Sequence, residues 1–264
     1  LGAGGIEEQS QDNAKLKLEW EVTPKLTASF MLGYFANRDR AHDETYLRNP
    51  AGGPVFSGPL NIAGFAYNIP ASTFAAGVSD LDERHWMQAL TLRGAASSSL
   101  RWEAIASLYD YGKDEQRAPS TALPGALSGG AGTILDLSGT GWRTLDLKAI
   151  WTPSDVHTVT FGVHDDRFVL GSDRYNTADW ISGAPGALAA LSRGKTQTDA
   201  VFIEDTVRLG PDLRLTLGLR DEHWRAFDGF NFSLSPALAV NQPALSADRA
   251  SPKAVLAWTP APGW

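Results

Sequence analysis

One short stretch of this chain alternates strictly between apolar and polar side chains. Over residues 213–220, Leu occupies every odd position, while Arg, Thr and Gly occupy the even ones. Successive side chains on a β-strand point to opposite faces, so this period of two predicts a strand with one apolar and one polar face. The same alternation recurs in nearly every apolar segment of the chain. These segments are longer than the roughly 5–6 residues of an average strand.

The alternation predicts nine strands, joined in turn by short turns and long loops. We expect the strands at residues 14–22, 25–36, 82–94, 99–111, 142–151, 156–169, 196–209, 212–225 and 251–258. The predicted turns are 23–24, 95–98, 152–155 and 210–211, and residues 259–264 suggest one more. The predicted loops are 37–81, 112–140, 170–195 and 226–250.

The two classes of connection indicate the architecture. Loops longer than about 15 residues are uncommon in compact domains. Outer-membrane barrels, however, combine short periplasmic turns with long extracellular loops. A strand needs roughly 9–11 residues to cross a bilayer, and the predicted segments have about that length. The predicted fold class is therefore all-β: an antiparallel up-and-down transmembrane β-barrel segment, about nine strands of a larger barrel.

Aromatic residues lie close to the predicted turns, where an interfacial girdle would be found. Trp20, Trp151 and Trp258 are each within three residues of a turn that contains Pro. A second girdle is predicted at the far strand ends, from Tyr34, Tyr109, Phe168 and Trp224.

Asp205 conflicts with the apolar alternation because it shares the apolar phase of Val201, Ile203, Val207 and Leu209. A position away from the midplane, or a bulge that turns Asp205 inward, would each reduce its cost.

Composition excludes several classes of protein. The sequence has no Cys, so it forms no disulfides and no thiolate metal sites. The net charge of -7 argues against a nucleic-acid partner. The mean hydropathy is -0.20 and no long apolar run is present, which excludes a transmembrane helix. A soluble all-β protein with one face in solvent remains the alternative to a membrane barrel.

Three segments carry a family resemblance: residues 198–222 (TDAVFIEDTVRLGPDLRLTLGLRDE), 224–229 (WRAFDG) and 251–258 (SPKAVLAW). This succession of strand, Gly-Pro-Asp turn and strand resembles TonB-dependent receptors. The resemblance implies a barrel of about 22 strands with a plugged lumen. Residues 1–264 would then form part of the barrel domain, without the plug, the TonB box and the C-terminal strands. We also expect the chain to begin inside an extracellular loop and to end at a periplasmic turn.

The resemblance further implies gated import across the outer membrane of a Gram-negative bacterium. The expected cargo is an iron–siderophore complex, and no catalytic residue and no cofactor are expected. The expected partners are outer-membrane lipid and lipopolysaccharide, the TonB complex through the missing plug, and the small extracellular ligand. The alternatives are a passive porin or adhesin barrel, and a receptor for another ligand such as cobalamin or a saccharide.

Aromatic and cationic residues near the extracellular end are the candidate ligand-binding residues, because ligand pockets combine aromatic walls with a few polar groups. They are Arg38, Arg40, Tyr109, Tyr111, Arg117, Arg174, Tyr175 and Trp180. Three acidic triplets, 42–44, 164–166 and 221–223, each include a His, and their carboxylate and imidazole groups are possible metal ligands. Their position near strand ends favours solvation or lipopolysaccharide-bound cations, so no metal site is predicted. The polar faces of the strands are expected to form a charge-balanced inner wall.

Overall fold

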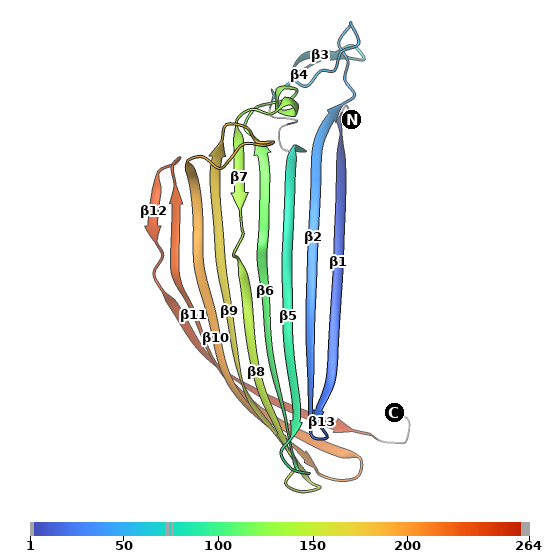
Figure 1. The fold of residues 1–264 in the computed structure, drawn as a ribbon, viewed down its shortest axis with the longest axis vertical. Coiled ribbons are helices and arrows are strands. Elements are labelled where there is room, and N and C mark those ends of the chain that lie inside the picture. Colours follow the sequence, from blue (N-terminus) through green and yellow to red (C-terminus); the bar gives the residue numbers. More distant parts are fainter. Residues whose placement is uncertain (1–2, 72–73, 75–76, 260–264) are drawn as a thin grey trace.

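The structure, a computed structural model, describes residues 3–71, 74 and 77–259. It is a single curved antiparallel sheet of eleven strands, with a separate two-stranded hairpin at its upper end (Figure 1). The sheet contains β1 (Ala3–Thr23), β2 (Leu26–Thr45), β5 (Ser79–Ala95), β6 (Leu100–Pro119), β7 (Gly132–Asp136), β8 (Gly141–Trp151), β9 (His157–Thr177), β10 (Leu188–Arg208), β11 (Leu213–Ser233), β12 (Leu238–Asn241) and β13 (Leu245–Trp258). The hairpin is β3 (Gly58–Ile62) and β4 (Phe65–Ile69), and a short 3-10 turn, η2, covers Gly125–Ser128. Within the described residues, no helix has the length and apolar character needed to span a membrane.

The strands follow one another across the sheet in up-and-down order. Both β7 and β8 pair with β9 and with β6, so they share one position between those strands. Similarly, β12 and β13 both pair with β11. The eleven strands of the described chain therefore occupy nine positions across the sheet, as the sequence predicts. The four predicted short turns all lie at the lower end of the sheet (Figure 1).

The register aligns the apolar residues of successive strands on one face of the sheet. Phe30 of β2 lies opposite Leu18 of β1 and Leu90 of β5, and Leu90 lies opposite Ala106 of β6. We call this face the outer face and the opposite one the inner face. Leu18 is 49% exposed and Leu90 is 40% exposed. A continuous exposed apolar surface of this kind marks contact with a membrane or a partner.

Aromatic residues border the apolar band of the outer face. Near the short turns these are Trp20, Trp102, Trp151 and Trp258, which alternation places with the aliphatic residues of their strands. At the other border the rings of Tyr34 and Trp86 pack with centroids 4.6 Å apart. The prediction of a second outer girdle is correct for Tyr34 only. Alternation within their strands places Tyr109, Phe168 and Trp224 on the inner face.

The strands extend well beyond the predicted upper borders, so the predicted loops are too long. Parts of residues 37–81, 112–140, 170–195 and 226–250 belong to strands. Residues 3–13 belong to β1, which corrects the expectation that the chain begins in a loop. The hydrophobic alternation ends at the upper border of the apolar band. Above this border, charged pairs join neighbouring strands, such as Arg40 with Asp80 at 3.1 Å and Arg193 with Asp173 at 2.6 Å. Of the last predicted turn, residues 260–264 lie outside the described residues.

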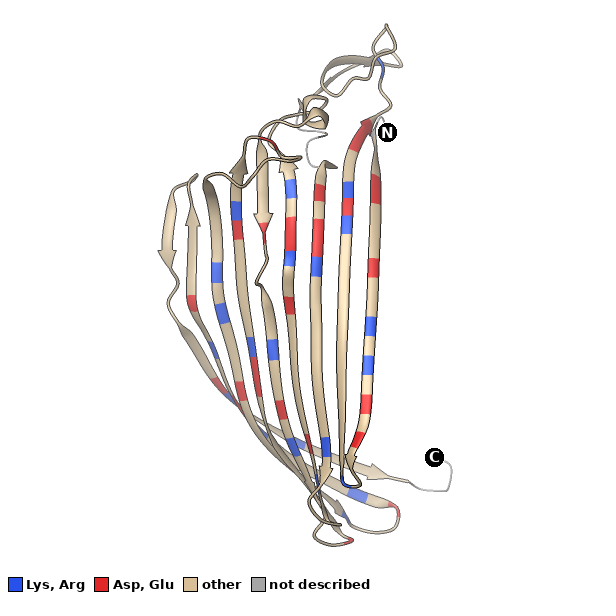
Figure 2. Cartoon of the chain, in the orientation of Figure 1, with Lys and Arg blue, Asp and Glu red and all other residues tan. Residues whose placement is uncertain are grey.

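Charge is distributed unevenly along the strands (Figure 2). The middle of β2 carries no charged residue, whereas its upper end carries several (Figure 2).

Above the strands, the connections pack into a small hydrophobic core of Phe74, Val78, Leu123, Ala126 and Trp180. Trp180 also donates a hydrogen bond from Nε1 to the carbonyl oxygen of Ala126 at 2.8 Å. This core holds the connections that follow β6 and β9 together.

Candidate functional site

Polar and aromatic side chains converge on the inner face where β5 and β6 rise above the apolar band. A β-bulge at Gly112 produces this convergence. Tyr111 lies opposite His85, but Lys113 already lies opposite Arg84, so Gly112 is the extra residue on β6. A bulge shifts the alternation of the residues that follow it. Asp114 therefore shares the inner face with Tyr111, although the two residues are three positions apart.

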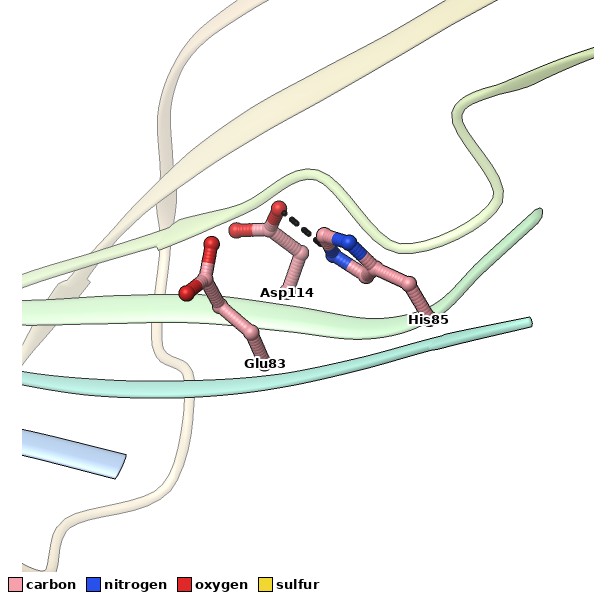
Figure 3. Close-up of side chains that lie close together, drawn as sticks. All are labelled: Glu83, His85 and Asp114. Carbon is pink, nitrogen blue, oxygen red and sulfur yellow. Dashed lines mark hydrogen bonds and ion pairs between the residues drawn. The ribbon is translucent and has the colours of Figure 1, made fainter. Parts of the chain in front are cut away.

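His85 is the centre of this cluster. Its Nδ1 lies 3.1 Å from the hydroxyl of Tyr109. Its Nε2 lies 3.2 Å from Oδ2 of Asp114, the contact drawn in Figure 3. The Tyr111 ring stacks on the imidazole with centroids 4.0 Å apart and an angle of 12°. His85 and Asp114 are each only 6% exposed. Tyr109 in turn stacks on Trp142 with centroids 4.3 Å apart. The imidazole is therefore held on several sides.

A second carboxylate, Glu83, points toward the same place (Figure 3). One donor atom each from Glu83, His85 and Asp114 lie within 4.8 Å of one another. Asn37 of β2 donates a hydrogen bond from Nδ2 to Oε2 of Glu83 at 2.8 Å. Burial, followed by the charge of Glu83, raises the pKa of Asp114, and His85 only partly opposes this. The ion pairs within the described residues include none between these two acids and a Lys or Arg.

The eight predicted ligand-binding residues do not form one site. Tyr109 and Tyr111 belong to the inner-face cluster, and Arg174 shares that face on β9. The register places Arg38, Arg40, Arg117 and Tyr175 on the outer face, and Trp180 is 7% exposed in the small loop core. The inner-face residues are the ones that a ligand inside a barrel could contact.

Besides Arg40, which pairs with Asp80, the outer-face residues Arg117 and Tyr175 have contacts within the protein. Arg117 donates hydrogen bonds to Oε1 of Glu115 at 2.6 Å and to the carbonyl oxygen of Gly183 at 2.9 Å. The hydroxyl of Tyr175 donates to Oδ2 of Asp173 at 3.3 Å. The bond to Gly183 ties β6 to the loop of residues 178–187, and the other two bonds lie within single strands. A structural role is thus visible for both side chains.

The three acidic triplets do not converge, because neighbours along a strand face opposite sides. On β9, His164 contacts Asp146 of β8 on the inner face at 2.7 Å, whereas Asp165 lies on the outer face and accepts from Gln197 at 2.7 Å. His223 contacts Asp248 on the outer face at 2.6 Å. Among the described residues, none of these triplets brings three donor atoms together.

Among the described residues, the three-residue group whose donor atoms do converge is Glu83, His85 and Asp114. Sequence analysis missed this group. Glu83 and His85, two residues apart on a predicted strand, could have been recognised as sharing a face. The bulge and the register that bring Asp114 to them could not be read from the sequence.

Lower on the inner face, cross-strand ion pairs balance the charge. Glu103 of β6 accepts from Arg93 of β5 at 2.6 Å and from Lys148 of β8 at 2.8 Å. Glu204 of β10 and Lys253 of β13 are paired at 2.5 Å across β11. These pairs agree with the predicted charge-balanced inner wall.

These features define the class of protein. One layer of long antiparallel strands carries an apolar band with aromatic borders on one face and ion pairs on the other. A soluble sheet would need a second layer to cover the apolar band, but a transmembrane β-barrel places it against lipid. The chain has the architecture of a transmembrane β-barrel wall.

Comparison with known proteins identifies the family. The family described as "TonB dependent receptor-like, beta-barrel" matches residues 20–264, and the chain belongs to this family. The sequence matches no curated protein at a significant level. The resemblance found in the sequence and the predicted fold class are both confirmed.

Several solved structures share the fold. One is the ferric citrate transporter FecA in its unliganded form, with a TM-score of 0.62, 14% identity, and coverage of 96% of this chain and 34% of FecA. Another is FpvA of P. aeruginosa bound to heterologous pyoverdines, with a TM-score of 0.62, 15% identity and coverage of 97% and 34%. A third is the ferric yersiniabactin uptake receptor FyuA from Yersinia pestis, with a TM-score of 0.52, 11% identity and coverage of 99% and 44%. The chain thus spans about a third of the first two structures.

Proposed function

We propose that this chain is part of the barrel domain of a TonB-dependent receptor that imports an iron–siderophore complex across the outer membrane. The family membership supports the receptor class. The names of the similar structures, which refer to ferric citrate, pyoverdine and ferric yersiniabactin, support an iron chelate as cargo. In this proposal, the chain forms part of the barrel wall, and a plug elsewhere in the protein contacts TonB.

The observation that carries the proposal is the aromatic surface at the upper end of the inner face. Tyr109 and Tyr111 contact His85 there, Trp142 stacks on Tyr109, and Arg174 shares the face. Aromatic walls with a few polar groups are typical of ligand pockets, and an Arg suits an anionic chelate. A ligand that descends between the extracellular loops would meet this surface before the ion-paired wall below it.

Uptake of iron tests the proposal directly. Cells that express the full-length receptor as their sole candidate importer are given a panel of ⁵⁵Fe-loaded siderophores, with TonB present or absent. We expect uptake of at least one complex, and we expect it to require TonB. Uptake that continues without TonB would support the alternative of a passive barrel. Uptake of cobalamin or a saccharide, with no uptake of iron, would contradict the cargo.

A pair of variants tests the aromatic surface. Tyr109→Ala removes a ring from the inner face, and Tyr34→Ala removes one from the outer face at the other side of the same wall. We expect Tyr109→Ala to raise the ligand concentration needed for half-maximal uptake several-fold, and Tyr34→Ala to leave it unchanged. Equal effects of the two variants would contradict a ligand contact at Tyr109.

The outer face above the apolar band would contact lipopolysaccharide. Arg38, Arg40, Arg84 and Lys113 lie on this face above the Tyr34–Trp86 border, among the acids Asp80 and Asp82. Phosphate groups attract Arg and Lys, and divalent cations can join phosphates to the acids. This position supports lipopolysaccharide as a partner of the complete receptor.

A further inference from the structure

We propose that Glu83, His85 and Asp114 form a binding site for a divalent transition-metal cation, with Zn²⁺ as the best match. The site lies on the inner face, where β5 pairs with β6 beside the Gly112 bulge (Figure 3). It goes beyond the proposed function, because the import of a chelated ligand needs no metal bound to the wall.

The donor set suits such a cation. One imidazole nitrogen and two carboxylate oxygens are ligands that Zn²⁺ accepts, with a fourth position for water or another ligand. The three donor atoms lie within 4.8 Å of one another. In a tetrahedral zinc site with bonds of about 2.0–2.2 Å, donors are about 3.3 Å apart. Metal binding would therefore bring the carboxylate oxygens closer to His85 than they are in this structure.

The charge of the cluster also favours a cation. Burying a carboxylate is costly unless it is paired or bound to a metal. Asp114 is 6% exposed, and its only ion-pair partner within the described chain is His85. The nearby cations are directed elsewhere: Arg84 and Lys113 both contact Asp82, on the outer face. A divalent cation would supply the missing positive charge.

An independent observation comes from Asn37 on the neighbouring strand. This residue is 6% exposed, and its Oδ1 is buried without a hydrogen-bond partner. Its Nδ2 donates to Glu83 at 2.8 Å, so the amide is next to the cluster. Turning the amide over would bring Oδ1 toward Glu83, and a cation between the two oxygens would stabilise that arrangement. The unpartnered oxygen is therefore a candidate fourth ligand.

The surroundings of His85 fit a metal-binding imidazole. A metal-binding His usually donates its second ring N–H to an acceptor that fixes the ring. Nδ1 of His85 lies 3.1 Å from the Tyr109 hydroxyl, which can accept this bond. Nε2 then remains for the metal, in the place where it now contacts Asp114. The stacked ring of Tyr111 restricts rotation of the imidazole.

Zinc binding to the complete receptor tests this site. The full-length protein is purified in detergent, stripped with a chelator and titrated with ZnCl₂ in a calorimeter. We expect one high-affinity zinc ion in this segment, and at least a tenfold loss of affinity in Asp114→Asn and His85→Asn. His164→Asn is the matched control, since His164 also lies on the inner face but pairs with Asp146 alone. Its zinc affinity should equal that of the wild type.

A spectroscopic measurement on the wild type guards against variants that misfold. X-ray absorption of the zinc-loaded receptor should show one imidazole with oxygen ligands. The site would be overturned by two or more imidazole ligands, by the absence of stoichiometric zinc, or by equal affinity in all three variants. Glu83, His85 and Asp114 would then form a structural hydrogen-bond network. Iron uptake is measured separately. A receptor that imports iron but binds no zinc overturns only the metal site, and the reverse result overturns only the proposed cargo.

Discussion

Nδ1 of His157 lies 2.8 Å from Oδ2 of Asp205, on the outer face beside the short turns. This contact explains how an acid can occupy the apolar phase of β10. His157 is the first residue of β9, and Asp205 is three residues before the end of β10 at Arg208. The pair is thus at the border of the apolar band, where a charged side chain on the lipid face costs least. Asp205 does not turn inward, so its place away from the midplane is the explanation that holds.

The first prediction concerns this pair. His157→Ala leaves the Asp205 carboxylate without its partner, and one of its oxygens is already buried and unpartnered. We expect the unfolding free energy to fall by about 1 kcal/mol. This is the low end of the cost of leaving a polar group unpaired, because both side chains are partly exposed. Asp205→Leu removes the charge and extends the apolar row, so it should be neutral or stabilising. Urea unfolding of the full-length receptor in vesicles measures both, and equal destabilisation by the two variants would contradict the explanation.

The second prediction concerns close packing at the lower border. Gly94 lies directly opposite Trp102, and a Cβ atom built on Gly94 would come within 2.5 Å of Cε2 of the indole. Gly94→Ala should therefore displace the ring and cost about 1–3 kcal/mol. Gly218→Ala is the control, because its Cβ would meet no atom closer than 3.4 Å. The amount of folded receptor in isolated outer membranes, judged by heat-modifiable gel mobility, should fall only for Gly94→Ala.

The third prediction concerns pH. Burial alone would raise the pKa of Asp82, but the hydrogen bond and charge of Lys113, with Arg84 and Arg38, outweigh it and hold this pKa below 3.8. A lowered pKa in the folded state means that the carboxylate contributes stability above its unfolded pKa, and that this is lost as pH falls through the folded value. Asp82→Asn should then lower the unfolding free energy by up to about 1 kcal/mol at pH 7 and at pH 5. The difference from the wild type should shrink as pH falls below 3.8 and vanish once pH is below the folded pKa of Asp82. A difference that disappears already at pH 5 would show that Asp82 is not held in its charged form.

The fourth prediction concerns lipopolysaccharide. The double variant Arg38→Ala, Arg40→Ala should carry at most half as much lipopolysaccharide as the wild type when the full-length receptor is purified. Stability should change by less than about 1 kcal/mol, because exposed ion pairs contribute little; the Arg40 side chain is 76% exposed. Arg174→Ala, which removes a cation from the inner face, should leave the bound lipopolysaccharide unchanged. A matching loss in that control would contradict contact through the outer face.

The order of the strands and the positions of their turns could be predicted from the sequence, because apolar alternation directly reports the face of a strand. The upper ends could not be predicted in this way. Above Tyr34 the strands leave the apolar band, and pairs such as Arg40 with Asp80 hold them together instead. A criterion based on hydrophobicity ends the strand there, although the hydrogen-bonded ladder continues.

The candidate site shows the same limit. The sequence places aromatic and cationic candidates near the upper end, but residue type alone does not say which face of the sheet each side chain occupies. Alternation alone assigns Arg38 and Arg40 to the face of Phe30 and Leu32. The cluster around His85 depends on the Gly112 bulge, which changes which residues of β6 face inward. A bulge leaves only a weak signal in a single sequence.

The most direct test of the account is which face of the sheet contacts lipid. This segment has no Cys, so single cysteines can be introduced at Leu217 and at its neighbour Thr216 in a full-length receptor free of other reactive thiols, and labelled with a fluorophore. The register places Leu217 in the apolar row of the outer face and Thr216 on the inner face, where it contacts Thr206. In reconstituted vesicles, we expect brominated lipid to quench the label at position 217 strongly and the label at 216 weakly. Equal quenching at the two positions, or the reverse order, would contradict a transmembrane barrel wall with this orientation.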